Sequence, residues 1–102
     1  MEEYDKKRFK AFELVVEKTM SIVEDELNMD IGTTIEKEVA TEETLFGEKV
    51  RFGVHGESEF FSVSIIEEND LTEISLNEKR VKVKNSRLDE KMAQELADMI
   101  LG

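Results

Sequence analysis

The chain has 102 residues, with 14 Lys and Arg against 25 Asp and Glu, and its formal net charge is −11 at pH 7. A chain of this length is expected to form one domain, residues 1–102. The negative charge argues against direct binding to nucleic acid or to an anionic membrane surface. The absence of cysteine excludes disulfides and thiolate metal sites.

The N-terminal residues lack the pattern of a signal peptide, and no apolar run reaches the length of a membrane span. The near absence of linker residues, with no Pro and 5 Gly, favours a single folded unit. We therefore expect a cytoplasmic protein without a membrane partner.

Residues Asp5–Asn28 have the spacing of an amphipathic helix. Its apolar residues recur every three or four positions and share one stripe: Phe9, Phe12, Val16, Met20, Val23 and Leu27. A stripe of this kind is typical of a helix that packs on a core. Leu14 falls outside the stripe, on the charged side of the helix.

Residues Ile31–Thr41 fit either of two structures. In a helix, Ile35 and Val39 lie one turn apart, behind a capping-box pattern. In a strand, the same two residues face inward beside Lys37. We favour the strand because of Gly32 and the threonines around it, and we place it at an edge of the sheet, where an inward-pointing lysine discourages pairing with another molecule.

Residues Thr41–Gly47 are interpreted as a connection between strands. Leu45 and Phe46 are its large apolar residues. Because side chains of this kind are usually found inside proteins, we expect both to be partly buried anchors.

Residues Val50–Val83 alternate apolar and polar side chains, which predicts an antiparallel β-meander. The apolar positions that share one face are Val50, Phe52, Val54, Phe61, Val63, Ile65, Ile74, Leu76, Val81 and Val83. Tight turns are predicted at Glu57–Ser58, Glu68–Asn69 and Glu78–Lys79. The first turn pairs Phe52 with Val63, and the second pairs Val63 with Ile74. The third pairs Ile74 with Val83.

Residues Arg87–Leu101 are predicted to form a second amphipathic helix, with Ser86 as its N-cap. Its apolar face comprises Leu88, Met92, Leu96, Met99 and Ile100. The predicted fold is therefore α+β: an N-terminal helix, an antiparallel meander of four or five strands, and a C-terminal helix. Both helices are expected to cover the apolar face of the sheet in a two-layer arrangement.

His55 is the only histidine, and Glu57, Ser58 and Glu59 follow it closely. A metal site would need more nitrogen or sulfur ligands, or the spacing of a calcium loop. A nucleophilic site would need Ser58 oriented against His55 and an oxyanion donor, which no motif here indicates. We therefore expect no catalytic residues, no metal site and no cofactor, and a protein that is not an enzyme.

The charged residues form two groups of interest, one acidic and one basic. A candidate acidic surface comprises Glu36, Glu38, Glu42 and Glu43. If such acids gather on one surface, they could imitate the phosphates of a nucleic acid, whereas interleaved bases indicate an ordinary solvated surface. A basic segment comprises Lys79, Arg80, Lys82, Lys84 and Arg87. The third predicted turn places Glu73 opposite Lys84, and we expect acids to neutralise this segment.

Apolar residues without an internal partner indicate a binding surface. Phe60 lies on the second face of the sheet, where Ile66 is predicted to lie opposite Leu71, and Leu14 is similarly unpaired. A second copy or a protein partner would bury these groups. We expect a non-catalytic protein-interaction module, adaptor or chaperone-like and homodimeric. The alternative is an acidic nucleic-acid mimic, of mobile-element or phage type, that inhibits a DNA- or RNA-binding protein.

Overall fold

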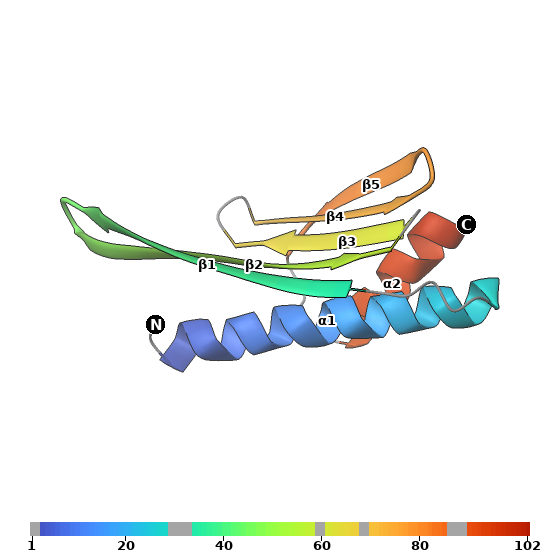
Figure 1. Cartoon of the computed structure of the whole chain (residues 1–102), viewed down its shortest axis with the longest axis horizontal. Helices are drawn as coiled ribbons and strands as arrows, with labels where there is room; N and C mark the ends of the chain where they lie inside the picture. Colours follow the sequence, from blue (N-terminus) through green and yellow to red (C-terminus); the bar gives the residue numbers. More distant parts are fainter. Residues whose placement is uncertain (1–2, 29–33, 59–60, 68–69, 86–89) are drawn as a thin grey trace.

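The computed structural model describes residues 3–28, 34–58, 61–67, 70–85 and 90–102. The elements in chain order are α1 (Glu3–Leu27), β1 (Thr34–Thr44), β2 (Gly47–Glu57), β3 (Phe61–Ile66), β4 (Leu71–Leu76), β5 (Lys79–Lys84) and α2 (Glu90–Leu101). The strands form one antiparallel sheet in the order β1-β2-β3-β4-β5. α1 packs on β2 and β3, α2 packs on β4 and β5, and the two helices contact each other (Figure 1). The predicted α+β fold is confirmed.

The core lies between the two helices and the inner face of the sheet. Its buried side chains come from α1 (Phe12, Val15, Val16, Met20, Val23), the sheet (Phe52, Val54, Phe61, Val63, Ile65, Ile74) and α2 (Met92, Ala93, Leu96, Ala97, Ile100). The predicted stripe of the first helix and the alternation of the strands are thus confirmed, except at Val50, whose side chain lies outside the described part of the structure. Met99 differs from the prediction, because it is 38% exposed while Ala93 and Ala97 lie in the core. In the described part of the chain, no helix is both long and apolar enough to cross a membrane.

The pairing of β3 with β4 is as predicted. Val63 lies opposite Ile74, and Ile66 lies opposite Leu71. The predicted pairing of β2 with β3 is wrong, because Val63 lies opposite Gly56 and not opposite Phe52. The cause is a longer connection than Glu57–Ser58. The amide of Ser58 donates to the carbonyl of Phe61 at 2.8 Å, and the amide of Phe61 donates to Ser58 Oγ at 3.2 Å.

The predicted pairing of β4 with β5 is also wrong by two positions. Ile74 lies opposite Val81, and Glu73 lies opposite Lys82 where Lys84 was expected. The turn begins one residue earlier than predicted, at Asn77, whose φ is 55°. Asparagine tolerates this left-handed conformation better than most residues, which explains the position of the turn.

The segment that fitted both a helix and a strand is a strand. β1 begins at Thr34 and lies at the edge of the sheet, as predicted. Lys37 reaches towards α1, where its Nζ lies 2.9 Å from Glu13 Oε1. Among the other predictions, those on residues 31–33, on Phe60, on the second turn at residues 68–69 and on residues 86–89 lie outside the described residues, including the N-cap Ser86.

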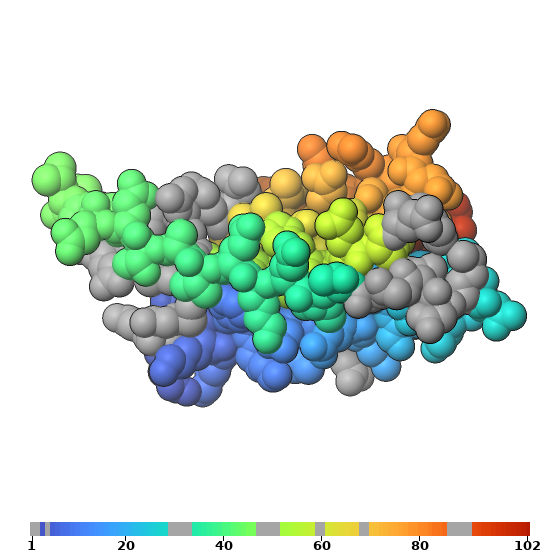
Figure 2. All heavy atoms as spheres, in the orientation of Figure 1, coloured from blue at the N-terminus to red at the C-terminus, as the bar shows by residue number. Residues whose placement is uncertain are grey.

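The predicted connection Thr41–Gly47 is wrong. β1 continues to Thr44 and β2 begins at Gly47, so only Leu45 and Phe46 remain as the loop of a long hairpin. The predicted burial of these two residues is also wrong, since Leu45 is 99% exposed and Phe46 is 100% exposed. Figures 1 and 2 show the hairpin extending past the rest of the sheet, along the long axis of a molecule that measures 48 × 23 × 23 Å.

Candidate functional site

The β1–β2 hairpin extends away from the body of the protein because its neighbour is short. β1 and β2 are 11 residues each and pair without a bulge over their full length. β3 pairs with β2 only from Gly53 to Glu57. The amide of Glu67 also donates to the carbonyl of Phe52 at 3.0 Å. The hairpin beyond Phe52 is therefore a ribbon of two strands. Because isolated two-stranded ribbons are marginally stable in water, the stability of the domain does not explain this extension.

Leu45 and Phe46 form the hairpin tip. Two-residue hairpin loops favour Asn-Gly or similar pairs with positive φ, but neither Leu45 nor Phe46 has a positive φ. The loop is closed by the amide of Phe46, which donates to Thr44 Oγ1 at 3.2 Å. Turn formation therefore gives no reason for large apolar side chains at these two positions. Val39, on the same hairpin, is also 56% exposed.

The predicted apolar surface is only partly assembled. Ile66 and Leu71 lie opposite each other on the outer face of the sheet, the face that the helices leave open. Both are half-buried. Leu14 is 54% exposed, but it belongs to α1 on the other side of the sheet. Leu14 therefore does not join the other two residues in one surface.

The predicted acidic surface lies along β1. All four of its residues are exposed: Glu36, Glu38, Glu42 and Glu43. Because side chains alternate along a strand, the first three share the outer face and Glu43 points to the opposite face. Three basic residues of β5 also point to the outer face, since Arg80 lies opposite Ser75, Lys82 opposite Glu73 and Lys84 opposite Leu71. Lys79, opposite Leu76, belongs to the inner face. The outer face therefore has an acidic edge and a basic edge.

A polar cluster around His55 lies between these edges. Nδ1 of His55 is 2.7 Å from Ser64 Oγ, and Nε2 is 3.5 Å from Glu38 Oε2. Together with Glu36, Glu57 and Ser62 these residues line a depression of about 350 Å³. Ser58, the neighbour considered from the sequence, instead donates its hydroxyl to the carbonyl of Phe61 at 3.1 Å.

The His55–Ser64 pair lacks the surroundings of a nucleophilic site. Ser64 lies in the middle of β3, which pairs with β2 on one side and β4 on the other. Its neighbouring backbone amides are used by these ladders, so they are not free to stabilise an oxyanion. Among the described residues, no group of three or more His, Cys, Asp and Glu side chains is placed to hold a metal ion.

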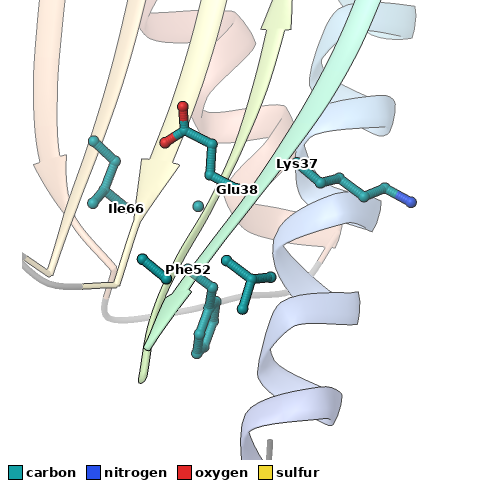
Figure 3. A pocket seen from close by; sticks show the side chains of 7 residues that line it. Lys37, Glu38, Phe52 and Ile66 are labelled. Atoms are coloured by element: carbon teal, nitrogen blue, oxygen red, sulfur yellow. The ribbon is translucent and has the colours of Figure 1, made fainter. Parts of the chain in front are cut away.

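A larger hollow of about 520 Å³ opens beside the acidic edge (Figure 3). It is lined by Lys37, Glu38, Val39, Ala40, Phe52, Gly53 and Ile66. In Figure 3, Glu38 and Lys37 point to opposite sides of β1, and Ile66 lies on the side of Glu38. Gly53 lies between Glu38 and Ile66 in the register and has no side chain to fill the space.

An ion pair attaches the base of the hairpin to α1. Lys37 lies 2.9 Å from Glu13 and Lys10 lies 3.7 Å from it. The hydrogen bond from Lys37 is the main cause that lowers the pKa of Glu13 below its ordinary value, and the charge of Lys10 acts in the same direction. This ion pair therefore holds β1 against α1 at the point where the hairpin begins to extend from the rest of the sheet.

Comparison of the chain with protein-family models, with curated proteins and with solved structures found no match in any of the three. Function is therefore inferred from the surfaces described above.

Proposed function

We propose that this protein is a non-catalytic protein-interaction module, adaptor or chaperone-like, that binds a protein partner through its hairpin tip. The observation that supports this most strongly is the exposure of Leu45 and Phe46, 99% and 100%, at the end of a two-stranded ribbon. The fold gains no core contact from either side chain. A partner with an apolar pocket would bury both.

The tip offers enough apolar surface for a specific contact. Full burial of a Leu or Phe side chain is worth about 1.5–3 kcal/mol each. The pair therefore contributes about 3–6 kcal/mol, and each 1.4 kcal/mol changes affinity about tenfold. Leu45 and Phe46 are thus expected to dominate the binding energy.

The charges near the tip indicate the chemistry of the partner. Next to Leu45 and Phe46, Glu42 lies opposite Lys49 in the register, whereas Glu43 lies opposite Glu48, so acids outnumber bases there. The chain as a whole carries a net charge of −11. Opposite charges at the rim of an interface accelerate association, and like charges oppose it. The partner is therefore expected to hold the tip in an apolar pocket bordered by basic side chains.

Catalysis is not part of the proposal. His55 is the one histidine in the sequence, and the hydrogen bond with Ser64 lies on a regular strand without free backbone donors near the hydroxyl. Acyl transfer depends on such donors for much of its rate. A role for His55 in the polar face of the sheet is therefore favoured over a role as a base.

The proposal is tested by affinity capture from a native lysate with matched variants. Leu45→Ser/Phe46→Ser is compared with the control Leu14→Ser/Met99→Ser, which changes two exposed apolar residues on the helices. We expect the tip variant to lose a partner that wild type and control retain, with affinity reduced about 100-fold or more. A partner bound equally by all three proteins would contradict the proposal.

The second candidate is an acidic mimic of nucleic acid. Glu36, Glu38 and Glu42 lie on the same face of the edge strand, which favours this reading, whereas Lys82 and Lys84 on the same face oppose it. A mimic would capture a nucleic-acid-binding protein that elutes at modest salt, because exposed ion pairs are screened. Changing the three glutamates to lysine would abolish that capture, and the tip variant would retain it.

A further inference from the structure

The outer face of the sheet is built in rows that cross all of its strands. Residues paired between antiparallel strands point to the same side, so the register defines each row. The row nearest the hairpin is Glu38, Gly53, Ile66, Leu71 and Lys84, and the next row is Glu36, His55, Ser64, Glu73 and Lys82. Each of these two rows begins with an acid on β1 and ends with a base on β5, whereas the third row begins with Thr34 and ends with Arg80.

The charges at both ends of the rows are accessible. Glu36, Glu38, Lys82 and Lys84 are exposed, and the side chain of Glu38 keeps 74% of its surface in solvent. Arg80 is the basic residue of β5 that approaches Glu73, at 3.8 Å. Within the residues that the structure describes, no carboxylate forms a salt bridge with Lys82 or Lys84. Because both lysines are exposed, acids of another molecule can reach the basic edge.

We propose that the outer face is the interface of a symmetric homodimer, in which a second copy packs face to face about a two-fold axis parallel to β3. This operation places β1 of one copy over β5 of the other. Glu38 then meets Lys84 of the second copy, and Glu36 meets Lys82 of the second copy. Because the interface is isologous, each of these pairs occurs twice.

The side chains at the centre of the two rows also fit those of the second copy when the two-fold axis is parallel to β3. Ile66 lies on the axis and meets Ile66 of the second copy, while Leu71 meets the position of Gly53, beside the hollow of about 520 Å³. In the next row, His55 meets Glu73 of the second copy. Small side chains such as that of Ser64 leave room for two sheets to approach to about 10 Å, the usual spacing of aligned sheets.

The charges also select this axis among those available. A two-fold axis in the plane of the sheet but perpendicular to the strands would place β1 over β1 and β5 over β5. Glu36 and Glu38 would then face the same acids of the second copy, and Lys82 and Lys84 would face the same bases. Like charges placed opposite each other cost several kcal/mol, so the strand-parallel axis is favoured.

The dimer would present both hairpins at the same end, since a strand-parallel axis preserves the direction of every strand. Binding through the two tips rests on the proposed function of the tip, whereas the dimer itself does not. Two tips on one particle would bind a partner with two sites more tightly than one tip, through the higher effective concentration of the second.

The proposal is tested by a charge exchange, measured by sedimentation equilibrium over a wide concentration range. Wild type is expected to dimerise. Glu38→Lys alone places two lysines against each other, and Lys84→Glu alone places two glutamates against each other, so each variant should self-associate about 10- to 100-fold more weakly. An equimolar mixture restores both ion pairs. In the mixed dimer the lysine introduced at position 38 meets the glutamate introduced at position 84, and the native Lys84 of the first variant meets the native Glu38 of the second, so the mixture should dimerise like wild type.

The matched controls are Glu17→Lys and Lys18→Glu, which make the same changes of net charge on the exposed surface of α1. Both should dimerise like wild type, alone and mixed. The proposal is overturned if wild type stays monomeric up to its solubility limit, if Glu38→Lys dimerises as strongly as Glu17→Lys, or if the mixture of Glu38→Lys with Lys84→Glu stays monomeric. None of these results bears on the capture experiment with the tip variant, so the two proposals fail separately.

Discussion

Gly56 provides a quantitative test of how α1 docks on the sheet. A Cβ atom at this position of β2 would lie 2.8 Å from Val16 Cγ1 and 3.1 Å from Met20 Cγ. Carbon atoms in favourable contact are about 3.5–4.0 Å apart, so the added methyl would be about 0.7 Å too close to Val16. Overpacking of this kind costs about 1–3 kcal/mol. Replacing glycine lowers the entropy of the unfolded chain, which offsets about 0.4–1 kcal/mol of this cost.

We therefore expect Gly56→Ala to lower the free energy of unfolding by about 1–2 kcal/mol. In a urea titration with an m-value of about 1–1.5 kcal/mol/M, the midpoint would fall by about 1 M. The cost should largely disappear in a Val16→Ala background, because that change removes the atom which the new methyl meets. A midpoint that is unchanged or higher in Gly56→Ala, or that falls equally in both backgrounds, would refute this packing of α1 against β2.

Two further substitutions test polar contacts at the ends of the sheet. Asn85 is 4% exposed, accepts a hydrogen bond from the Thr72 hydroxyl and donates to the carbonyl of Ile66 at 3.2 Å. Asn85→Ala would leave these buried groups unpaired, and chemical denaturation should show that the free energy of unfolding falls by about 1–3 kcal/mol, against a change near zero for Glu78→Ala in the exposed turn. Because Lys37 lowers the folded-state pKa of Glu13, the carboxylate contributes stability above its unfolded pKa and loses it as the pH falls through the folded value. The free energy of unfolding of wild type should therefore exceed that of Glu13→Gln by about 0.5–1 kcal/mol at pH 7. If this difference does not shrink below about pH 4, the contact between Lys37 and Glu13 is contradicted.

The face of each strand could be predicted from the sequence, but the pairing could not. A period of two places Val63 and Ile74 on the core face in every register that differs by an even number of residues. Two of the three predicted pairings were wrong by such even shifts, so every core residue kept its face. What decided the register was local turn chemistry, at Ser58 through its hydroxyl and at Asn77 through its positive φ.

The hairpin tip could not be predicted because burial was assumed from side-chain type. Leu45 and Phe46 are apolar, and most residues of this kind lie inside proteins. Their position beyond the end of β3 depends on the unequal lengths of β2 and β3, 11 and 6 residues. The sequence nevertheless contains a pattern that indicates the hairpin, since Thr34–Thr44 and the residues after Gly47 are both able to form long strands around a two-residue loop.

The charge arrangement of the outer face also could not be predicted from the sequence. The acids of β1 and the bases of β5 were recognised from the sequence as separate groups, and Glu73 was correctly placed among the acids that face the basic segment. Their arrangement at opposite edges of one face depends on the strand order and on the register of Lys82 and Lys84. Only the assembled sheet shows that the rows of Glu38 and Glu36 have an acid at one end and a base at the other, so that each row can pair with the same row of a second copy.

The most direct test of the proposed function is photo-crosslinking from the hairpin tip. Phe46 is replaced by benzoylphenylalanine, the protein is irradiated in native lysate, and the crosslinked peptides are identified by mass spectrometry, with the same substitution at the exposed Leu14 as the control. We expect position 46 to crosslink to residues that line an apolar pocket of one partner, while position 14 gives no crosslink to that partner. Crosslinks to a partner from position 14 but none from position 46 would contradict the proposal that this protein binds through its hairpin tip.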